Sequence, residues 1–419
     1  MECIRAYKFA VYPDEKRRKE IDNMLVLAQR LYNKILEKTR EEYKKSTNSK
    51  VNLSTLNMYM NEAIKENKEF SKLYSQTRQD IFVRLQRAFQ NFFRRVNKSK
   101  HGKKVKVGFP RFKPIDRYKS LKYPQNNGSF SIEKKRKTIM LRVSKIGRMK
   151  IDLHRQIGGD IKTLTIKREA GQYYAIFTAI EHISLPKIED TNPIGIDLGL
   201  NNFIALSDGT KVEKPKFAMK REKRIARWQR KIARRQMKSK RRQKAKQVLE
   251  KEWKYATNQS EDFAHKLSSE LVHSGATSFA AEKLNIQNMA KNHRLAQSIY
   301  NASWNKFIQM LSYKAESAGM KVILVDPRGT TQECSNCHHV KKGSEMLTLE
   351  DRIYHCNACG FTIDRDQNAA INIRNRSRAG LARSYAQGDD CLCASTGSAS
   401  SVGELRTYSA SAGEAPTFR

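Results

Sequence analysis

The order in which two hydrophobic periodicities follow one another limits what this chain can fold into. Residues 4–13 alternate apolar and polar side chains with a period of two and end at a proline, which predicts a strand. Apolar residues then recur at helical spacing, and the period-two alternation returns over residues 128–180. We therefore expect an antiparallel β-barrel over residues 1–13 and 105–185, interrupted by a helical insertion over residues 14–104.

A second pattern of strands and helices begins near residue 190. Apolar runs over residues 194–199 and 203–206 predict two adjacent strands, with Asp197 on the first of them. Further strands are expected near residues 277–281 and 321–325, separated by an amphipathic helix. Such alternation is typical of an α/β domain, so the expected fold class is α+β and multidomain. The α/β domain is assigned to residues 186–327 and 364–378.

Residues 216–254 are the most basic segment of the chain, with 18 Lys and Arg against 3 Asp and Glu. A narrow apolar stripe of Ile225, Trp228 and Ile232 predicts a long basic helical arm. Like charges three and four residues apart on a helix repel, so this arm should need phosphate neighbours; a merely solvated helix is the alternative. The net charge of +40 for the whole chain also favours a polyanionic partner.

Composition argues against membrane, secreted and disulfide-bonded classes. There is no apolar run near 18 residues and no signal-peptide pattern, so we expect a cytoplasmic protein without a membrane partner. Seven cysteines are too few and too unevenly placed for a disulfide framework. Residues 379–419, with Cys391 and Cys393, are rich in Ser, Ala and Gly, which predicts a disordered tail.

Four of the cysteines form two Cys-x-x-Cys pairs, Cys334 with Cys337 and Cys356 with Cys359. The 18 residues between the pairs allow both to converge on one tetrahedral ion, which predicts a zinc ribbon over residues 328–363. A site of four thiolates leaves no open position, so one structural Zn²⁺ is expected; buried or redox-active cysteines are the alternative. Three neighbouring histidines are left out of the ligand set: His338, His339 and His355.

Three carboxylates stand at the ends of predicted elements. Asp197 lies on a strand, Glu282 follows the apolar residues 278–281, and Asp366 begins a predicted helix. Mg²⁺ prefers hard oxygen ligands, and nucleases gather carboxylates to hold two such ions about 3.5–4 Å apart. The pattern alone leaves open that Asp197 belongs to a turn and that Asp366 only caps its helix.

Several of these segments together resemble the TnpB family, which is encoded by insertion sequences. The similarity spans most of residues 1–378 in order and spacing. It departs at Thr331, where serine is common, and after Cys337, where glycine is common. The matching motifs are Gly195-Ile196-Asp197-Leu198-Gly199, Ala281-Glu282-Lys283-Leu284 with Asn288-Met289, both cysteine pairs, residues 364–373, Gly108-Phe109-Pro110-Arg111-Phe112, Trp304, Tyr313 and Thr331-Gln332.

The resemblance implies an RNA-guided DNA endonuclease with an oligonucleotide-binding-like wedge barrel, a helical recognition insertion and an RNase H-like (RuvC-like) nuclease domain interrupted by the ribbon. It implies Asp197, Glu282 and Asp366 as the catalytic triad and ligands of Mg²⁺, with two ions expected and Mn²⁺ able to substitute; Asp364 is a second candidate beside Asp366. The implied partners are a guide RNA from the transposon end and double-stranded target DNA with a short adjacent motif, and no small-molecule substrate. The implied location is the prokaryotic cytoplasm, in association with the nucleoid. Candidate nucleic-acid contacts are Gln79, Lys103, Lys104, Arg111, Arg227, Arg230 and Arg234.

Three other functions share parts of this pattern. A non-catalytic regulator of transposition would bind RNA and DNA through a decayed nuclease fold, and the intact triad argues against it. A DNA-strand transferase would share the carboxylate chemistry but would not need so large an RNA-binding surface. A miniature type V CRISPR effector would differ mainly in its genomic neighbourhood.

Overall fold

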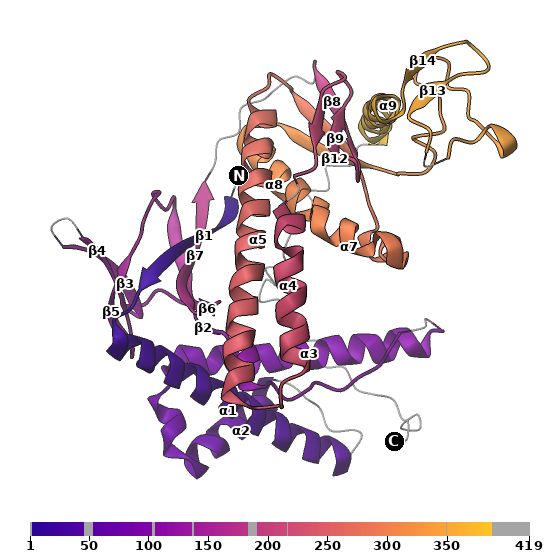
Figure 1. Ribbon diagram of the computed structural model, residues 1–419. Coiled ribbons are helices and arrows are strands. Elements are labelled where there is room, and N and C mark those ends of the chain that lie inside the picture. The colour runs from indigo at the N-terminus through magenta and orange to yellow at the C-terminus, as the bar shows by residue number, and fades with distance from the viewer. Residues whose placement is uncertain are drawn as a thin grey trace. The chain divides into compact units, whose positions relative to one another are not determined.

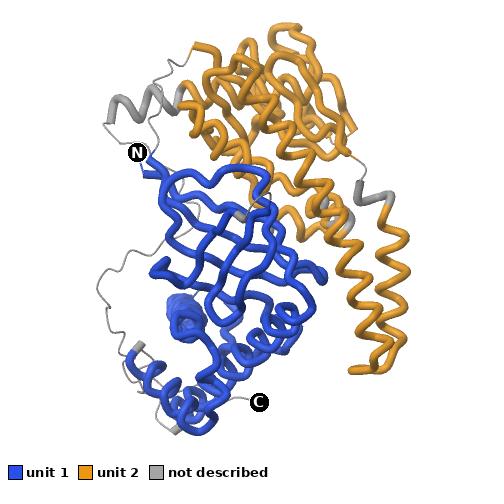
Figure 2. The backbone as a smooth tube through the Cα atoms, turned by 90° about the vertical axis from the view of Figure 1, so that its left-hand side faces the viewer, with its two compact units in different colours: residues 1–182, 399–419 blue, residues 183–398 orange. Residues whose placement is uncertain are grey.

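The computed structural model describes residues 2–45, 53–102, 105–135, 138–182, 191–215, 217–348 and 350–387. The described residues form two compact units, one up to His182 and one from residue 191 onward (Figure 2). None of the helices in these ranges combines the length and apolar character that a membrane span requires.

The first unit is built on a seven-stranded antiparallel sheet with the order β2-β6-β7-β1-β5-β4-β3 (Figure 1). The first strand pairs along most of its length with β7, from Glu2 opposite His182 to Val11 opposite Tyr173, as the interrupted pattern predicts. Strand β2 was missed because it is only four residues long. The strands are β1 (Glu2–Tyr12), β2 (Ser120–Tyr123), β3 (Phe130–Lys135), β4 (Thr138–Val143), β5 (Gly147–Ile151), β6 (Asp160–Glu169) and β7 (Gln172–His182).

The predicted antiparallel barrel is corrected to an open half-barrel, because β2 and β3 stand at the two ends of the sheet among the described residues. Helices explain the difference, because their apolar faces and one face of the sheet belong to a single buried core. Ile21 and Phe89 from the helices share this core with Phe9 and Phe177 from the strands. The three helices are α1 (Glu15–Lys45), α2 (Leu53–Glu66) and α3 (Ser75–Lys100), with short 3₁₀ turns at Lys68–Lys72 and Ile115–Arg117.

The second unit contains a mixed five-stranded sheet with the order β10-β9-β8-β11-β12. Strand β8 runs antiparallel to β9 but parallel to β11, and β11 runs parallel to β12. The carboxyl ends of β8, β11 and β12 therefore lie at one edge of the sheet. The strands are β8 (Pro193–Leu198), β9 (Asn202–Leu206), β10 (Lys211–Glu213), β11 (Ser278–Glu282) and β12 (Lys321–Val325), which confirms the strands predicted in this half.

Helices cover this sheet and complete the unit. The predicted amphipathic helix is α8 (Trp304–Ser317), which buries Trp304, Phe307 and Leu311. Two shorter helices, α6 (Ile286–Met289) and α7 (His293–Ala302), precede it. Beyond β12 come a 3₁₀ turn at Gly343–Glu345, the two-stranded ribbon sheet of β13 (Ile353–His355) and β14 (Thr362–Asp364), and α9 (Arg365–Gln387).

Gly195 allows α9 to lie directly on β8. A methyl group at this glycine would overlap the carbonyl oxygen of Ala370 and approach Cβ of Arg374 to 3.0 Å. We expect Gly195→Ala to destabilise the second unit by about 2–3 kcal/mol through overpacking, which lowers its melting temperature by roughly 5–10 °C. Calorimetry would measure the change; Gly108→Ala, which meets open space, is the matched control.

The predicted basic helical arm is a hairpin of two helices, with a turn that the sequence analysis did not predict. Helices α4 (Phe217–Ala233) and α5 (Lys240–Val272) run side by side (Figure 1). The chain reverses where Lys238 takes a left-handed backbone conformation and the Ser239 side chain accepts a hydrogen bond from the N–H of Arg242. The capping role of Ser239 is difficult to predict from the sequence, because residues with helical propensity flank it on both sides.

Helix α9 continues past Arg378, where we expected order to end, and reaches Gln387. Alanine, leucine and arginine in this stretch favour a helix even though they offer little apolar surface for a core. The rest of the predicted tail, residues 388–419 with Cys391 and Cys393, lies outside the described residues.

Candidate functional site

Asp197, Glu282 and Asp366 come together at the carboxyl edge of the second sheet. In the parallel register, Ile196 of β8 lies opposite Ala281 of β11, so the next residues, Asp197 and Glu282, are neighbours. Asp366 lies in the first turn of α9, the helix that packs on β8. The three predicted carboxylates thus lie at the same edge of the sheet, close enough for the charges of Glu282 and Asp366 to act on Asp197.

Burial perturbs the two strand-end carboxylates, Asp197 most strongly. Burial raises the pKa of Asp197 to about 8, with further contributions from the charges of Glu282 and Asp366 and an opposing one from Arg365. Burial also raises the pKa of Glu282, although a hydrogen bond from Thr330 counteracts it. Carboxylates that repel one another in a buried site are stabilised by a cation, so the donor set fits Mg²⁺.

Asp364 caps helix α9, which answers the open question whether Asp366 does so. Its Oδ1 accepts hydrogen bonds from the N–H groups of Asp366 and Gln367 at 3.0 and 3.2 Å, so Asp364, not Asp366, caps α9. Its Oδ2 lies 2.6 Å from Nζ of Lys211 on β10. Asp366 is therefore free of the capping role.

The raised pKa of Asp197 predicts a pH-dependent cost in stability when no metal is bound. A carboxyl whose pKa is higher in the folded than in the unfolded protein favours folding fully below about pH 4 and loses that contribution as the pH rises through about 8. Asp197→Asn should therefore raise the melting temperature in EDTA, with a gain that grows from pH 5 to pH 8. An equal gain at both values would contradict this account.

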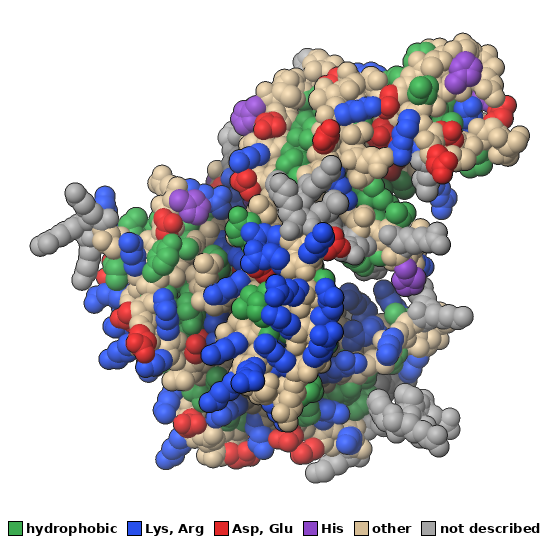
Figure 3. Space-filling view, in the orientation of Figure 1, with side chains coloured by type: hydrophobic (Ala, Val, Ile, Leu, Met, Phe, Trp, Pro, Cys, Tyr) green, Lys and Arg blue, Asp and Glu red, His purple; other side chains and the backbone are tan. Residues whose placement is uncertain are grey.

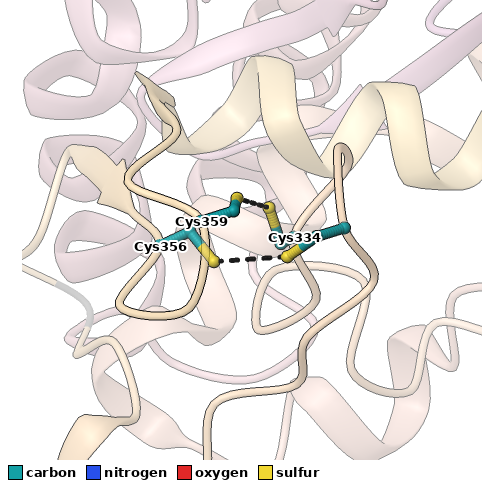
Figure 4. Close-up of side chains that lie close together, drawn as sticks. Cys334, Cys356 and Cys359 are labelled. Atoms are coloured by element: carbon teal, nitrogen blue, oxygen red, sulfur yellow. Dashed lines mark hydrogen bonds between the residues drawn. The ribbon is translucent and has the colours of Figure 1, made fainter.

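The four cysteines converge with their sulfurs within 4.8 Å of one another. Figure 4 shows Cys334, Cys356 and Cys359 pointing toward a common centre. The Sγ atoms of Cys334 and Cys359 are 3.8 Å apart, and those of Cys337 and Cys356 are 3.6 Å apart. A tetrahedral ion with Zn–S bonds of about 2.3 Å requires sulfur separations of about 3.8 Å, so the cluster has the dimensions of a zinc site.

The two cysteine pairs have matching turns. The N–H of His338 donates to the carbonyl of Cys334 at 3.0 Å, and that of Gly360 donates to the carbonyl of Cys356 at 2.9 Å. Both residues have left-handed backbones, with φ of 61° and 69°. Glycine adopts this conformation at little cost, so His338 carries a modest strain where the TnpB motif commonly has glycine.

The three histidines near the cysteines interact elsewhere. His338 Nδ1 lies 3.0 Å from a carboxylate oxygen of Glu333, and His355 Nδ1 lies 2.8 Å from the hydroxyl of Thr362. His339 Nε2 is 3.5 Å from a carboxylate oxygen of Glu345.

The candidate nucleic-acid contacts are solvent-exposed wherever the structure describes them. Arg227 and Arg230 lie on α4 and Arg234 just after it, and lysine and arginine side chains gather over α4 and α5 (Figure 3). Gln79 is exposed on α3 and Arg111 in the loop before β2. Lys103 and Lys104 lie outside the described residues.

The basic hairpin contains one buried acid that sequence reasoning did not single out. Glu252 of α5 lies 2.6 Å from Nη1 of Arg221 and 2.8 Å from Nη2 of Arg224, both on α4, and Arg221 also covers the ring of Tyr255. These pairs hold the two basic helices together. Nothing in the local sequence distinguishes Glu252 from an exposed helical glutamate.

Three family models match successive parts of the chain. A helix-turn-helix domain model matches residues 1–48, a probable transposase model of the IS605 OrfB type matches residues 175–293, and a Cas12f1-like TNB domain model matches residues 304–373. The last match includes the cysteine cluster and Asp366.

Relatives match over almost the whole chain. A protein of Streptomyces pristinaespiralis named "Putative RNA-guided DNA endonuclease" is 29% identical and covers 91% of this chain and 90% of its own. The protein with the same name and the suffix InsQ from Escherichia coli K12 is 26% identical and covers 91% of this chain and 94% of its own. Other relatives are named TnpB-like proteins.

The fold has a solved counterpart. The structure described as a Cas12f1–sgRNA–target DNA complex aligns with a TM-score of 0.59 at 12% identity, over 90% of this chain and 99% of that one. The mixed α+β architecture is therefore shared despite the low identity. Because the IS605 OrfB model matches part of the chain and the relatives match along its length, the chain belongs to the TnpB family.

Proposed function

We propose that this chain is an RNA-guided DNA endonuclease that cuts double-stranded DNA with Asp197, Glu282 and Asp366 in an RNase H-like (RuvC-like) nuclease domain. The meeting of these carboxylates at one sheet edge is the observation that carries the proposal. The family membership and the names of the relatives support it.

The three carboxylates would hold two Mg²⁺ ions, which Mn²⁺ would be able to replace.

 When bound, the metal would supply a Lewis acid and an ionised water to the scissile phosphate. Asp197, Glu282 and Asp366 would hold the metal through their carboxylate oxygens. The cysteines Cys334, Cys337, Cys356 and Cys359 would hold one structural Zn²⁺.

The surface charge suits a nucleic-acid partner whose sequence the protein does not itself read. The exposed arginines of the α4–α5 hairpin would contact the phosphate backbone of a guide RNA and its DNA heteroduplex, which leaves sequence choice to base pairing. Gln79 and Arg111 of the first unit are proposed contacts to the target-adjacent motif and its backbone. The first unit would thus correspond to a wedge and recognition module.

The decisive experiment starts with the chain expressed together with its native downstream DNA. RNA that copurifies would be sequenced, and the complex would be tested with Mg²⁺ on plasmids that carry a guide-matched site beside randomised flanks. Guide-dependent linearisation is the expected result. Bound RNA without cutting would favour the regulator of transposition, and a CRISPR array beside the gene would favour the type V effector.

A further inference from the structure

A short segment between β12 and the first cysteine pair connects the cysteine cluster to the carboxylates. We call residues 326–335 the ribbon root; it ends with Cys334, whose side chain is fully buried, and Ser335. Thr330 lies in its middle and is 1% exposed. Its hydroxyl donates a hydrogen bond of 2.5 Å to Oε1 of Glu282. The bond leaves Oε2 of the same carboxylate available to a cation.

Two buried asparagines of α9 hold the ribbon root in place. Asn368 and Asn372 are four residues apart, so they lie on the same face of the helix. Both side-chain amides donate to the carbonyl of Glu333 at 2.7 Å, and Asn372 also donates to the carbonyl of Thr330 at 3.0 Å. The side-chain oxygen Oδ1 of Asn368 accepts a hydrogen bond from the N–H of Ser335 at 2.9 Å. The root is thus bonded to the helix that carries Asp366.

Arg376 extends the same face of α9 by one more turn. Its guanidinium donates to the carbonyls of Arg328 and Asp326 at 2.6 and 3.1 Å and lies 2.7 Å from a carboxylate oxygen of Glu333. The three side chains at positions 368, 372 and 376 therefore fix the root along its length. Thr330 is the point at which this network reaches Glu282.

We propose that Thr330 is a positioning residue, which fixes the Glu282 carboxylate for metal binding and ties its orientation to the ribbon root. The inference rests on the proposed function, because it takes Glu282 to be a ligand of a divalent cation. Hydrogen bonds to a metal-binding carboxylate orient it, and their loss commonly weakens metal affinity or activity by about 10- to 100-fold. For the single bond from Thr330 we expect a loss of metal affinity of about tenfold. The two residues are 48 positions apart, so the contact has no signal in the sequence.

Thr330→Val tests the proposal because it removes the hydroxyl and keeps the shape of the side chain. The full chain, purified with its coexpressed RNA, would be titrated with Mn²⁺ and free Mn²⁺ followed by electron paramagnetic resonance. We expect the dissociation constant of the Asp197-dependent site to rise about tenfold, with an equal shift in the Mn²⁺ concentration required for cutting. Thr330→Ser, which keeps the hydroxyl, should restore native values to within about twofold.

Thr331→Val is the matched control, since the neighbouring threonine also lies in the ribbon root and is half-buried. Zinc content and melting temperature of all variants would be measured, so that unfolding of the root is recognised. Native Mn²⁺ affinity in Thr330→Val, no rescue by serine, or an equal loss in Thr331→Val would overturn the positioning role while the native complex still cuts. A native complex that neither cuts nor binds Mn²⁺ through Asp197 would instead refute the proposed function, and this inference with it.

Discussion

Replacement of Asp197 by alanine is expected to abolish Mg²⁺-dependent DNA cleavage while the protein keeps its RNA. The side chain is buried at the carboxyl edge of the second sheet, where the charges of Glu282 and Asp366 act on it. Loss of a metal-binding carboxylate removes several kcal/mol of transition-state stabilisation, which corresponds to roughly a thousandfold or more in rate. Cleavage of a guide-matched plasmid over time, with copurified RNA quantified in parallel, measures both effects.

Asp208→Ala is the appropriate control for this experiment. Asp208 is an exposed aspartate in the turn after β9, where it accepts a hydrogen bond from the N–H of Thr210 at 2.8 Å. Its loss should leave the cutting rate close to native. Rapid guide-dependent cleavage by the Asp197→Ala protein would remove Asp197 from the proposed triad, even if the control behaved as expected.

Replacement of Cys356 by serine is expected to release the bound zinc and to reduce cleavage together with it. Cys356 is fully buried in the cysteine cluster, 3.6 Å from Cys337 through their Sγ atoms. Structural zinc sites contribute about 10–16 kcal/mol of apparent binding free energy, so a ribbon with few apolar side chains depends on its metal. Disorder in the ribbon would reach Thr330 through the ribbon root and disturb Glu282.

Zinc per protein molecule, measured by elemental analysis, and cutting rate are the two readouts. Cys3→Ser supplies the same chemical change on β1 of the first unit, at a cysteine that is not part of the cluster, and should keep both values native. An unchanged zinc content in Cys356→Ser would exclude Cys356 as a ligand. Loss of zinc with a native cutting rate would support Cys356 as a zinc ligand but would show that cleavage does not depend on the ribbon.

Local patterns predicted most of the elements, because each depends on side chains that are close in the sequence. Strands β8, β9, β11 and β12 and helix α8 follow from short apolar runs, whose period reports directly which face is buried. The hairpin of α4 and α5 was missed since helical residues continue on both sides of its turn. The open form of the first sheet was missed because the packing of the predicted helices against one face of the sheet is decided by tertiary contacts.

The sequence by itself determined the four cysteines and their spacing, the three candidate carboxylates, the basic segment and the resemblance to TnpB. Only the tertiary structure decided that Glu252 joins the basic helices and that Thr330 bonds to Glu282. The reason is physical. A motif fixes the chemistry of its own side chains, whereas a hydrogen bond between residues 31 or 48 positions apart exists only after strands and helices have brought them together.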